Sequence, residues 1–203
     1  DATELDDSIT LDELTEGLLI QVEGQFVSDT VVEAEEIELR DGDAKIRGVV
    51  SLTTDSAFFI GGVEVRVGPT TTFTVEDGSD ITLQMLPVGN TAVEVEGIEK
   101  ELGADIFIDA LRVEVDSEEA DFGDRDKFEL EGQLRGISAI PGTITLFGVQ
   151  INDTSADYDN VLRGDIVDAF FGSDAPIILE VEYRKTASGY TADEIELEES
   201  DDD

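Results

Sequence analysis

A two-strand pattern in which Val or Ile alternates with Glu constrains the fold of this chain most, because the pattern occurs three times. Its first strand reads "GLLIQVEG" at 17–24, "GNTAVEVEG" at 89–97 and, more loosely, "APIILEVEY" at 175–183. A second strand follows each copy, at 31–40, 106–115 and 190–199. Alternation with period two predicts strands with one buried and one solvent-facing side. We call each two-strand copy a back half.

Two of the three back halves are preceded by a longer segment, which we call a front half, at 44–73 and 128–154. Each front half begins with a strand containing a glycine, Gly48 or Gly132, and continues into an apolar-Gly-Val strand. Capping residues and apolar spacing predict a short helix before each back half, near residues 10–16, 80–86 and 160–171.

Three strands, a helix and two strands is the element order of a small five-stranded Greek-key barrel of the OB type. The sequence therefore predicts an all-β fold of tandem small OB-like Greek-key barrels with short helices, in which the first repeat is incomplete. The expected domains are an N-terminal half-repeat of one helix and two strands (1–42), a first full barrel (43–117), and a second full barrel with an acidic C-terminal tail (118–203). The predicted cores contain Val95, Val113, Val63 and Ile60 in the first barrel and Val149, Leu130, Val181 and Ile195 in the second.

A back half without a front half leaves an unpaired strand edge and an uncovered apolar face. We expect this face to be an interface at which strands of another chain complete the half-repeat. The predicted interface residues are Leu18, Ile20, Val22, Ile37 and Leu39.

Charge limits the partners of the chain, which carries 51 acidic and 12 basic residues and a formal net charge of −39. Such a chain repels nucleic acid and anionic membranes and attracts cations and basic partners. Because the acidic residues are spread over the whole length, a saline or marine setting is favoured over one dedicated ion site. No apolar run is long enough for a transmembrane helix.

The chain has no His and no Cys, which removes thiol and imidazole chemistry and the usual zinc, copper and haem ligands. No nucleophile or phosphate-loop motif is present, so we predict no catalysis and no cofactor. Three acidic turns carry oxygen ligands that suit calcium, although solvated turns are the favoured interpretation. The calcium candidates are Glu118, Asp121, Asp124, Asp126, Asp153, Asp157 and Asp159.

The strand "VEVEG", the pattern A-x-x-I-E-V and a preceding G-V-x-V strand together resemble a bacterial family of exported domains of unknown function. The resemblance covers most of residues 8–199, and it implies export, tandem small barrels and no catalysis. The missing initiator Met fits the expectation of a processed, exported chain.

Two hypotheses about function remain open at this point. The first is an extracellular or cell-surface structural protein that self-associates into a homo-oligomer or filament by strand complementation. The second is a monomeric cell-surface module that binds calcium or a basic ligand.

Overall fold

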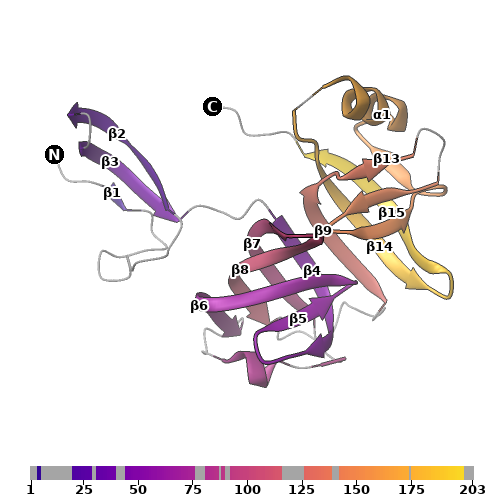
Figure 1. Cartoon of the computed structure of the whole chain (residues 1–203), viewed down its shortest axis with the longest axis horizontal. Helices are drawn as coiled ribbons and strands as arrows, with labels where there is room; N and C mark the ends of the chain where they lie inside the picture. The colour runs from indigo at the N-terminus through magenta and orange to yellow at the C-terminus, as the bar shows by residue number, and fades with distance from the viewer. Residues whose placement is uncertain are drawn as a thin grey trace. The chain divides into compact units, whose positions relative to one another are not determined.

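The chain forms an all-β structure, seen here in a computed structural model (Figure 1). The structure describes residues 4–5, 20–28, 31–39, 44–75, 81–86, 88–89, 92–115, 126–138, 142–173 and 175–198. The chain divides into two compact units, Asp1–Asp41 and Gly42–Asp203. We describe them as unit 1 and unit 2.

Unit 1 is a three-stranded sheet in the order β1-β3-β2 (Figure 1). Strands β2 (Ile20–Ser28) and β3 (Val31–Leu39) form the antiparallel hairpin that the sequence predicted. Strand β1 (Glu4–Leu5) pairs in parallel with β3 and was not predicted. The helix expected near residues 10–16 lies outside the described residues.

The first repeat of unit 2 is a closed five-stranded barrel. It contains β4 (Ala44–Thr53), β5 (Ala57–Ile60), β6 (Val63–Val75), β7 (Ala92–Leu102) and β8 (Asp105–Val115). The order runs β4-β5-β6-β8-β7 and closes because β7 also pairs with β4. The helix predicted near 80–86 is a single 3₁₀ turn, η1 (Leu83–Met85), which contributes Leu83 to the core.

The second repeat follows the same circuit with an interrupted first strand. Its elements are β9 (Lys127–Gln133), β10 (Gly136–Ile137), β11 (Ile144–Leu146), β12 (Val149–Asn152), β13 (Asp157–Asp159), α1 (Arg163–Gly172), β14 (Ile178–Thr186) and β15 (Gly189–Glu198). Strand β14 pairs with β9, while β15 pairs in parallel with β12 and β13. Helix α1 confirms the helix predicted near 160–171. Among the described residues, no helix has the length and apolar composition needed to cross a bilayer.

All three back halves share one irregularity, which fixes their alignment with one another. In each hairpin the register shifts directly after a glutamate, and the residue after the shift pairs with an alanine. Val22, Val95 and Val181 are therefore equivalent positions. The shifts follow Glu23, Glu96 and Glu182, and the pairs are Gly24 with Ala34, Gly97 with Ala110, and Tyr183 with Ala192.

The same alignment explains β1. Leu5 pairs with Ile37 as Phe73 pairs with Val113 and as Tyr158 pairs with Ile195. Strand β1 therefore stands at the end of the third strand of a repeat. Among the described residues of unit 1, counterparts of the last two strands and of the end of the third strand are present.

The two repeats of unit 2 are joined through their first strands. Ile46 of β4 pairs with Leu130 of β9, with Lys45 opposite Glu131 and Arg47 opposite Glu129. Buried side chains from both repeats form one core. The division of this unit at 117/118 into two separate domains stays a prediction.

Aromatic residues of the second repeat pack onto glycines of the first. A Cβ at Gly48 would lie 2.5 Å from Cδ1 of Phe128, and one at Gly61 would lie 2.2 Å from the Tyr183 hydroxyl. That hydroxyl donates a hydrogen bond of 3.1 Å to the Gly61 carbonyl oxygen. Absent side chains in one repeat thus make room for rings of the other.

The eight predicted core residues are all buried, which confirms the inward and outward faces of the strands. We expect Ile195→Ala, at a fully buried position, to lower the free energy of unfolding of unit 2 by about 2–4 kcal/mol. The equivalent change Ile37→Ala lies in unit 1 and should alter that transition by less than about 0.5 kcal/mol. Denaturant unfolding of the two variants measures the contrast, and equal losses would contradict the assignment of Ile37 to a separate unit.

Candidate functional site

The hairpin of unit 1 exposes the side that is buried in unit 2. We define the open face as Val22, Phe26, Val32 and Ile37. Val22 is 43% exposed, whereas its equivalents Val95 and Val181 are both 0% exposed. Val32 is 40% exposed, and its equivalent in the first repeat, Ile108, is 0% exposed. Val22, Val32 and Ile37 of the open face therefore occupy positions that are buried in the first repeat of unit 2.

Within the described part of unit 1, the pairing of strand β2 in the sheet is to one side alone. The equivalent strands β7 and β14 pair on that side with the first strands β4 and β9. Among the described residues, β2 pairs only with β3. An open edge next to an exposed apolar face is the arrangement that accepts an added strand.

The five predicted interface residues are described to different extents. Val22 is exposed and Ile37 is half-buried. Ile20 and Leu39 pair with one another at the ends of β2 and β3. Leu18 lies outside the described residues. The sequence missed Phe26, which is 78% exposed at the position equivalent to Glu99.

A second surface carries charge. Seven neighbouring strands, in the order β13, β15, β14, β9, β4, β7 and β8, place outward-facing residues directly opposite one another. These residues form two rows across the sheet, which we call rungs. Neighbouring strands lie about 4.8 Å apart, so the side chains of one rung are close neighbours. One rung holds Asp159, Glu196, Glu180, Glu131, Lys45, Glu96 and Arg112, and the other holds Asp157, Glu194, Glu182, Glu129, Arg47, Glu94 and Glu114.

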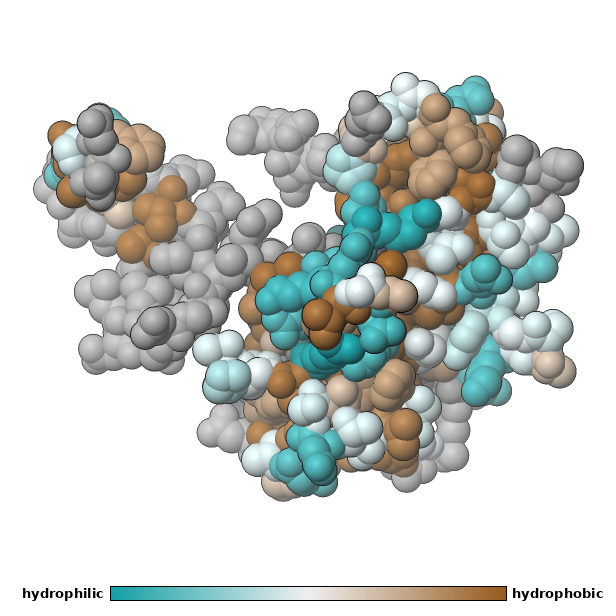
Figure 2. Space-filling view, in the orientation of Figure 1, coloured by the Kyte–Doolittle hydropathy of each residue, from teal (hydrophilic) through white to brown (hydrophobic). Residues whose placement is uncertain are grey.

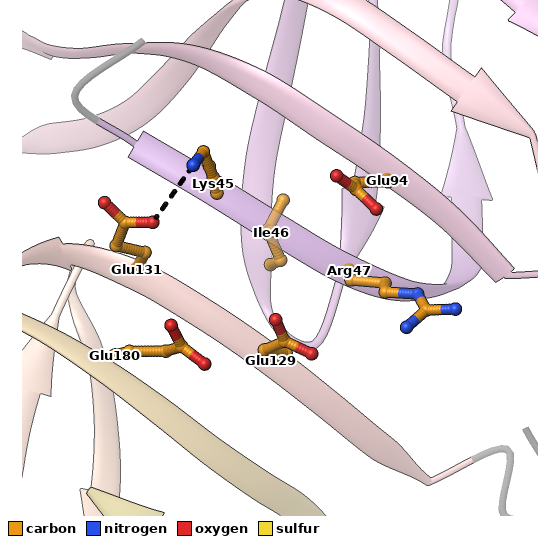
Figure 3. A pocket seen from close by; sticks show the side chains of 7 residues that line it. All are labelled: Lys45, Ile46, Arg47, Glu94, Glu129, Glu131 and Glu180. Atoms are coloured by element: carbon orange, nitrogen blue, oxygen red, sulfur yellow. Dashed lines mark ion pairs between the residues drawn. The ribbon is translucent and has the colours of Figure 1, made fainter. Parts of the chain in front are cut away.

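We call the four carboxylates of each rung on β13, β15, β14 and β9 the acidic face. Where β9 meets β4, these carboxylates reach Lys45 and Arg47 around a pocket of about 200 Å³ (Figure 3). The Lys45 ammonium lies 3.7 Å from a Glu131 carboxylate oxygen. Figure 2 shows a hydrophilic band across the middle of unit 2, with hydrophobic side chains beside it.

Crowding and burial raise the pKa values of carboxyls on this face. Burial is the main cause for Glu180, whose pKa is raised to about 7, and the charges of Glu129, Glu198 and Glu196 add to it. Burial also raises the pKa values of Glu129 and Glu131, opposed by the nearby Arg47 and Lys45 respectively. Glu180, Glu129 and Glu131 therefore hold their protons to a higher pH than free glutamate does.

Asp159, Glu194 and Glu196 offer the closest group of oxygen ligands among the described residues. One carboxylate oxygen of each lies within 4.8 Å of the others. The sequence predicted Asp159 as a calcium ligand but missed the two glutamates, because they stand on a distant strand. Asp157 pairs with Glu194 in the neighbouring register position.

Among the other calcium candidates, the described Asp126 and Asp153 do not belong to this group. Glu118, Asp121 and Asp124 lie outside the described residues. Asp126 precedes β9, and its carbonyl oxygen accepts a hydrogen bond of 2.7 Å from the Lys185 amide.

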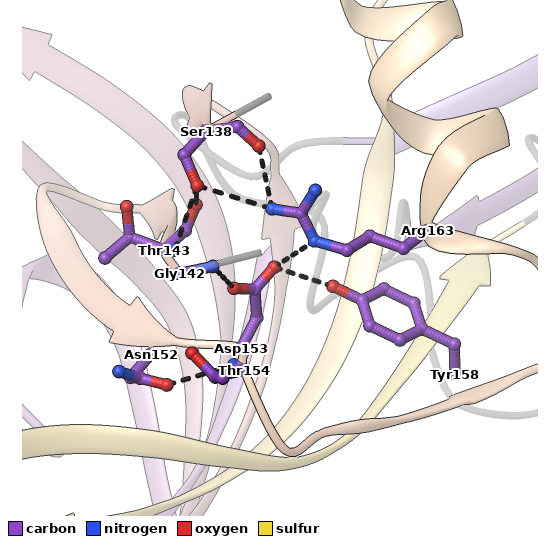
Figure 4. Close-up of polar contacts among 8 residues, drawn as sticks. All are labelled: Ser138, Gly142, Thr143, Asn152, Asp153, Thr154, Tyr158 and Arg163. Carbon is purple, nitrogen blue, oxygen red and sulfur yellow. Dashed lines mark hydrogen bonds and ion pairs between the residues drawn. The ribbon is translucent and has the colours of Figure 1, made fainter. Parts of the chain in front are cut away.

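Asp153 is buried between β12 and α1 (Figure 4). We call its hydrogen bonds with Gly142, Tyr158 and Arg163 the latch. Its carboxylate accepts hydrogen bonds from the Gly142 amide at 2.7 Å, the Tyr158 hydroxyl at 2.8 Å and Arg163 Nε at 2.6 Å. Burial and the hydrogen bond to Asp153 raise the pKa of the Tyr158 hydroxyl. With three donors satisfied, Asp153 holds the fold together. Arg163, which begins an Arg-Gly-Asp tripeptide, is engaged by the same latch.

The acidic face predicts that unit 2 loses stability as pH rises. Glu180 binds its proton more tightly in the folded chain than in the unfolded chain, so its contribution is present below about pH 4.5 and is lost as pH rises through about 7. We expect a higher unfolding midpoint at pH 5 than at pH 8 and a smaller difference in Glu180→Gln. Asp55→Asn, at an exposed bend, serves as the control. A midpoint that rises from pH 5 to pH 8 would contradict this account.

Neither a curated protein nor a solved structure is significantly similar to the chain. The model of a protein family described as a domain of unknown function, DUF5666, matches residues 1–38 and 47–114, together more than half of the chain. These segments include the strands of unit 1 and most of the first barrel of unit 2. The chain therefore belongs to the DUF5666 family of domains of unknown function.

Proposed function

We propose that this protein is a non-catalytic subunit of an extracellular or cell-surface assembly, and that unit 1 is completed by β strands of a neighbouring polypeptide. The observation that carries the proposal is the exposure of Val22, at 43% against 0% for both equivalent valines. Burying such a face and pairing the edge of β2 would add apolar contacts and backbone hydrogen bonds together.

The shared strand circuit supports the proposal that each complete repeat is an OB-like Greek-key barrel. In that fold the first strand pairs with the fourth, so the open edge of β2 is the place for a first strand. The absence of His and Cys from the sequence supports a structural role over catalysis. An extracellular location is proposed from the resemblance to exported domains.

Sedimentation velocity of the full chain in molar NaCl tests the role of the open face in association. We expect reversible self-association through exposed open faces, with Val22→Glu weakening it at least about tenfold. The matched control is Val27→Glu. Val27 is also exposed, and its equivalent in the first repeat, Lys100, stays exposed in the closed barrel. A chain that remains monomeric at high concentration, or two variants with equal effects, would contradict self-association through the open face.

A second candidate function is capture of a divalent cation such as calcium by the acidic face. The observation in its favour is the group of Asp159, Glu194 and Glu196, since calcium takes six to eight oxygen ligands in flexible geometry. Calorimetry with calcium at constant ionic strength should then give binding that Glu196→Gln weakens. Heat equal to that of a matched NaCl titration would contradict capture of a divalent cation, and equal heat from magnesium would mean that the site does not select calcium.

A further inference from the structure

The open face has a definite complement, which can be worked out from the two complete repeats. We propose that its occupant is a front-half segment whose first strand carries an apolar residue opposite Val22 and a glycine two residues later. This inference rests on the proposed function and specifies the chemistry of the partner.

The register comes from the complete repeats. Ile46 pairs with Val95, and Leu130 pairs with Val181. Both repeats place a glycine at the next inward position, where Gly48 pairs with Val93 and Gly132 pairs with Leu179. Transferred to unit 1, the incoming strand has its apolar residue opposite Val22 and its glycine opposite Ile20.

The glycine has a steric reason in both repeats. A Cβ at Gly132 would lie 2.1 Å from a ring carbon of Phe147, and one at Gly48 would lie 2.9 Å from a methyl carbon of Ile60. Residues of the second strand or of the turn that follows it cross over the first strand at this point. At Gly48 the nearest atom is Cδ1 of Phe128 in the other repeat, at 2.5 Å, but Ile60 of the second strand is also too close for a Cβ. We infer that the occupant brings a second strand as well as the first.

Charge selects between the two kinds of first strand in the chain. Lys45 of β4 is opposite Glu96, whereas Glu129 of β9 is opposite Glu182. In unit 1 the equivalent position is Glu23, which pairs with Glu36 across the hairpin. Only β4 places a basic residue at this register position, so we take β4 rather than β9 as the pattern for the occupant's first strand.

Stoichiometry excludes a spare front half from a second copy of this chain. Each copy has three back halves and two front halves, and in the described structure both front halves pair with back halves of unit 2. Two copies can cover their open faces only by packing them together, or by opening a closed barrel. The front half that completes unit 1 therefore comes from a polypeptide segment other than these 203 residues.

A fusion tests this without depending on intermolecular affinity. Residues 43–71 are placed directly before Glu4, where they replace residues 1–3 of the chain. The added third strand then continues into β1, with Glu4 in the register position of Thr72. Hydrogen exchange of the amides of β2 and β3 should slow at least about tenfold relative to the parent chain. The amides of unit 2 provide the internal reference.

Two altered fusions provide the controls. Asp in place of Ile46 in the appended copy should abolish the protection, and Glu in place of Lys45 should reduce it. Unprotected β2 amides in the unaltered fusion, or equal protection with the Asp version, would overturn the inference.

The outcomes for the inference and for the proposed function can be told apart. If association depends on Val22 but the fusion does not slow amide exchange in β2 and β3, only the proposed occupant is contradicted. If the fusion slows amide exchange in β2 and β3 but the parent chain does not self-associate, self-assembly is contradicted and the proposed occupant is supported.

Discussion

The unfolding midpoint of the chain is expected to rise by about 10 °C between about 0.01 M and 1 M NaCl. Carboxylates oppose one another at several positions of the acidic face, including Glu182 with Glu129 and with Glu194. Each like-charge cross-strand pair costs about 0.2–1 kcal/mol, and the Debye length falls from about 30 Å to about 3 Å over this range. Relief of several kcal/mol converts to a midpoint shift of that size, at about 2–4 °C per kcal/mol.

The source of the salt effect is tested by removing charge from the acidic face. Glu182→Gln combined with Glu194→Gln should raise the midpoint at low salt and flatten its dependence on NaCl. Glu33→Gln combined with Asp55→Asn removes the same charge from exposed positions outside this face and should do so much less. A midpoint that does not depend on NaCl would refute the repulsion account. Equal effects of the two double variants would mean that the salt effect comes from the net charge of the chain and not from the acidic face.

Gly61→Ala is expected to lower the free energy of unfolding of unit 2 by about 2–4 kcal/mol. The new Cβ would lie 2.2 Å from the Tyr183 hydroxyl and 2.9 Å from Cγ of Phe128. Overpacking a tight interior costs about 1–3 kcal/mol, and the positive φ of 56° adds strain of about 1 kcal/mol. Denaturant unfolding measures the loss.

Two further variants separate the clash from the backbone strain. Gly103 has a similar φ of 70° with nothing near its Cβ position, so Gly103→Ala should cost only about 1 kcal/mol. Tyr183→Phe removes the clashing hydroxyl, so the double variant with Gly61→Ala should lose less than the sum of the two single variants. Strict additivity would mean that the ring and the glycine do not compete for space.

Local patterns predicted the back halves well, because each is a hairpin whose alternation is written in consecutive residues. The same holds for Val95 and Ile195, whose inward orientation follows from period two. Strand β1 could not be found this way, since two residues such as Glu4 and Leu5 carry no period. Its position depends on parallel pairing with β3, which only the folded sheet shows.

The candidate sites divide in the same way. Val22 and Ile37 were predicted as interface residues because the missing front half can be counted in the sequence. The rungs of the acidic face depend on which strands become neighbours, above all on the pairing of β4 with β9. The calcium candidates were chosen from acidic turns, where neighbouring residues are visible in sequence. That choice did not include Glu194 and Glu196, which the folded sheet brings close to Asp159. It did include Asp153, whose carboxylate accepts three hydrogen bonds.

The pairing of β4 with β9 also bears on which strand edges of a repeat are used. Each first strand has one edge left over after its own barrel closes, and in unit 2 the two repeats use these edges on each other. A completed unit 1 would present a third such edge with no counterpart in the chain. Completing unit 1 would therefore create a further strand edge, at which another strand could pair.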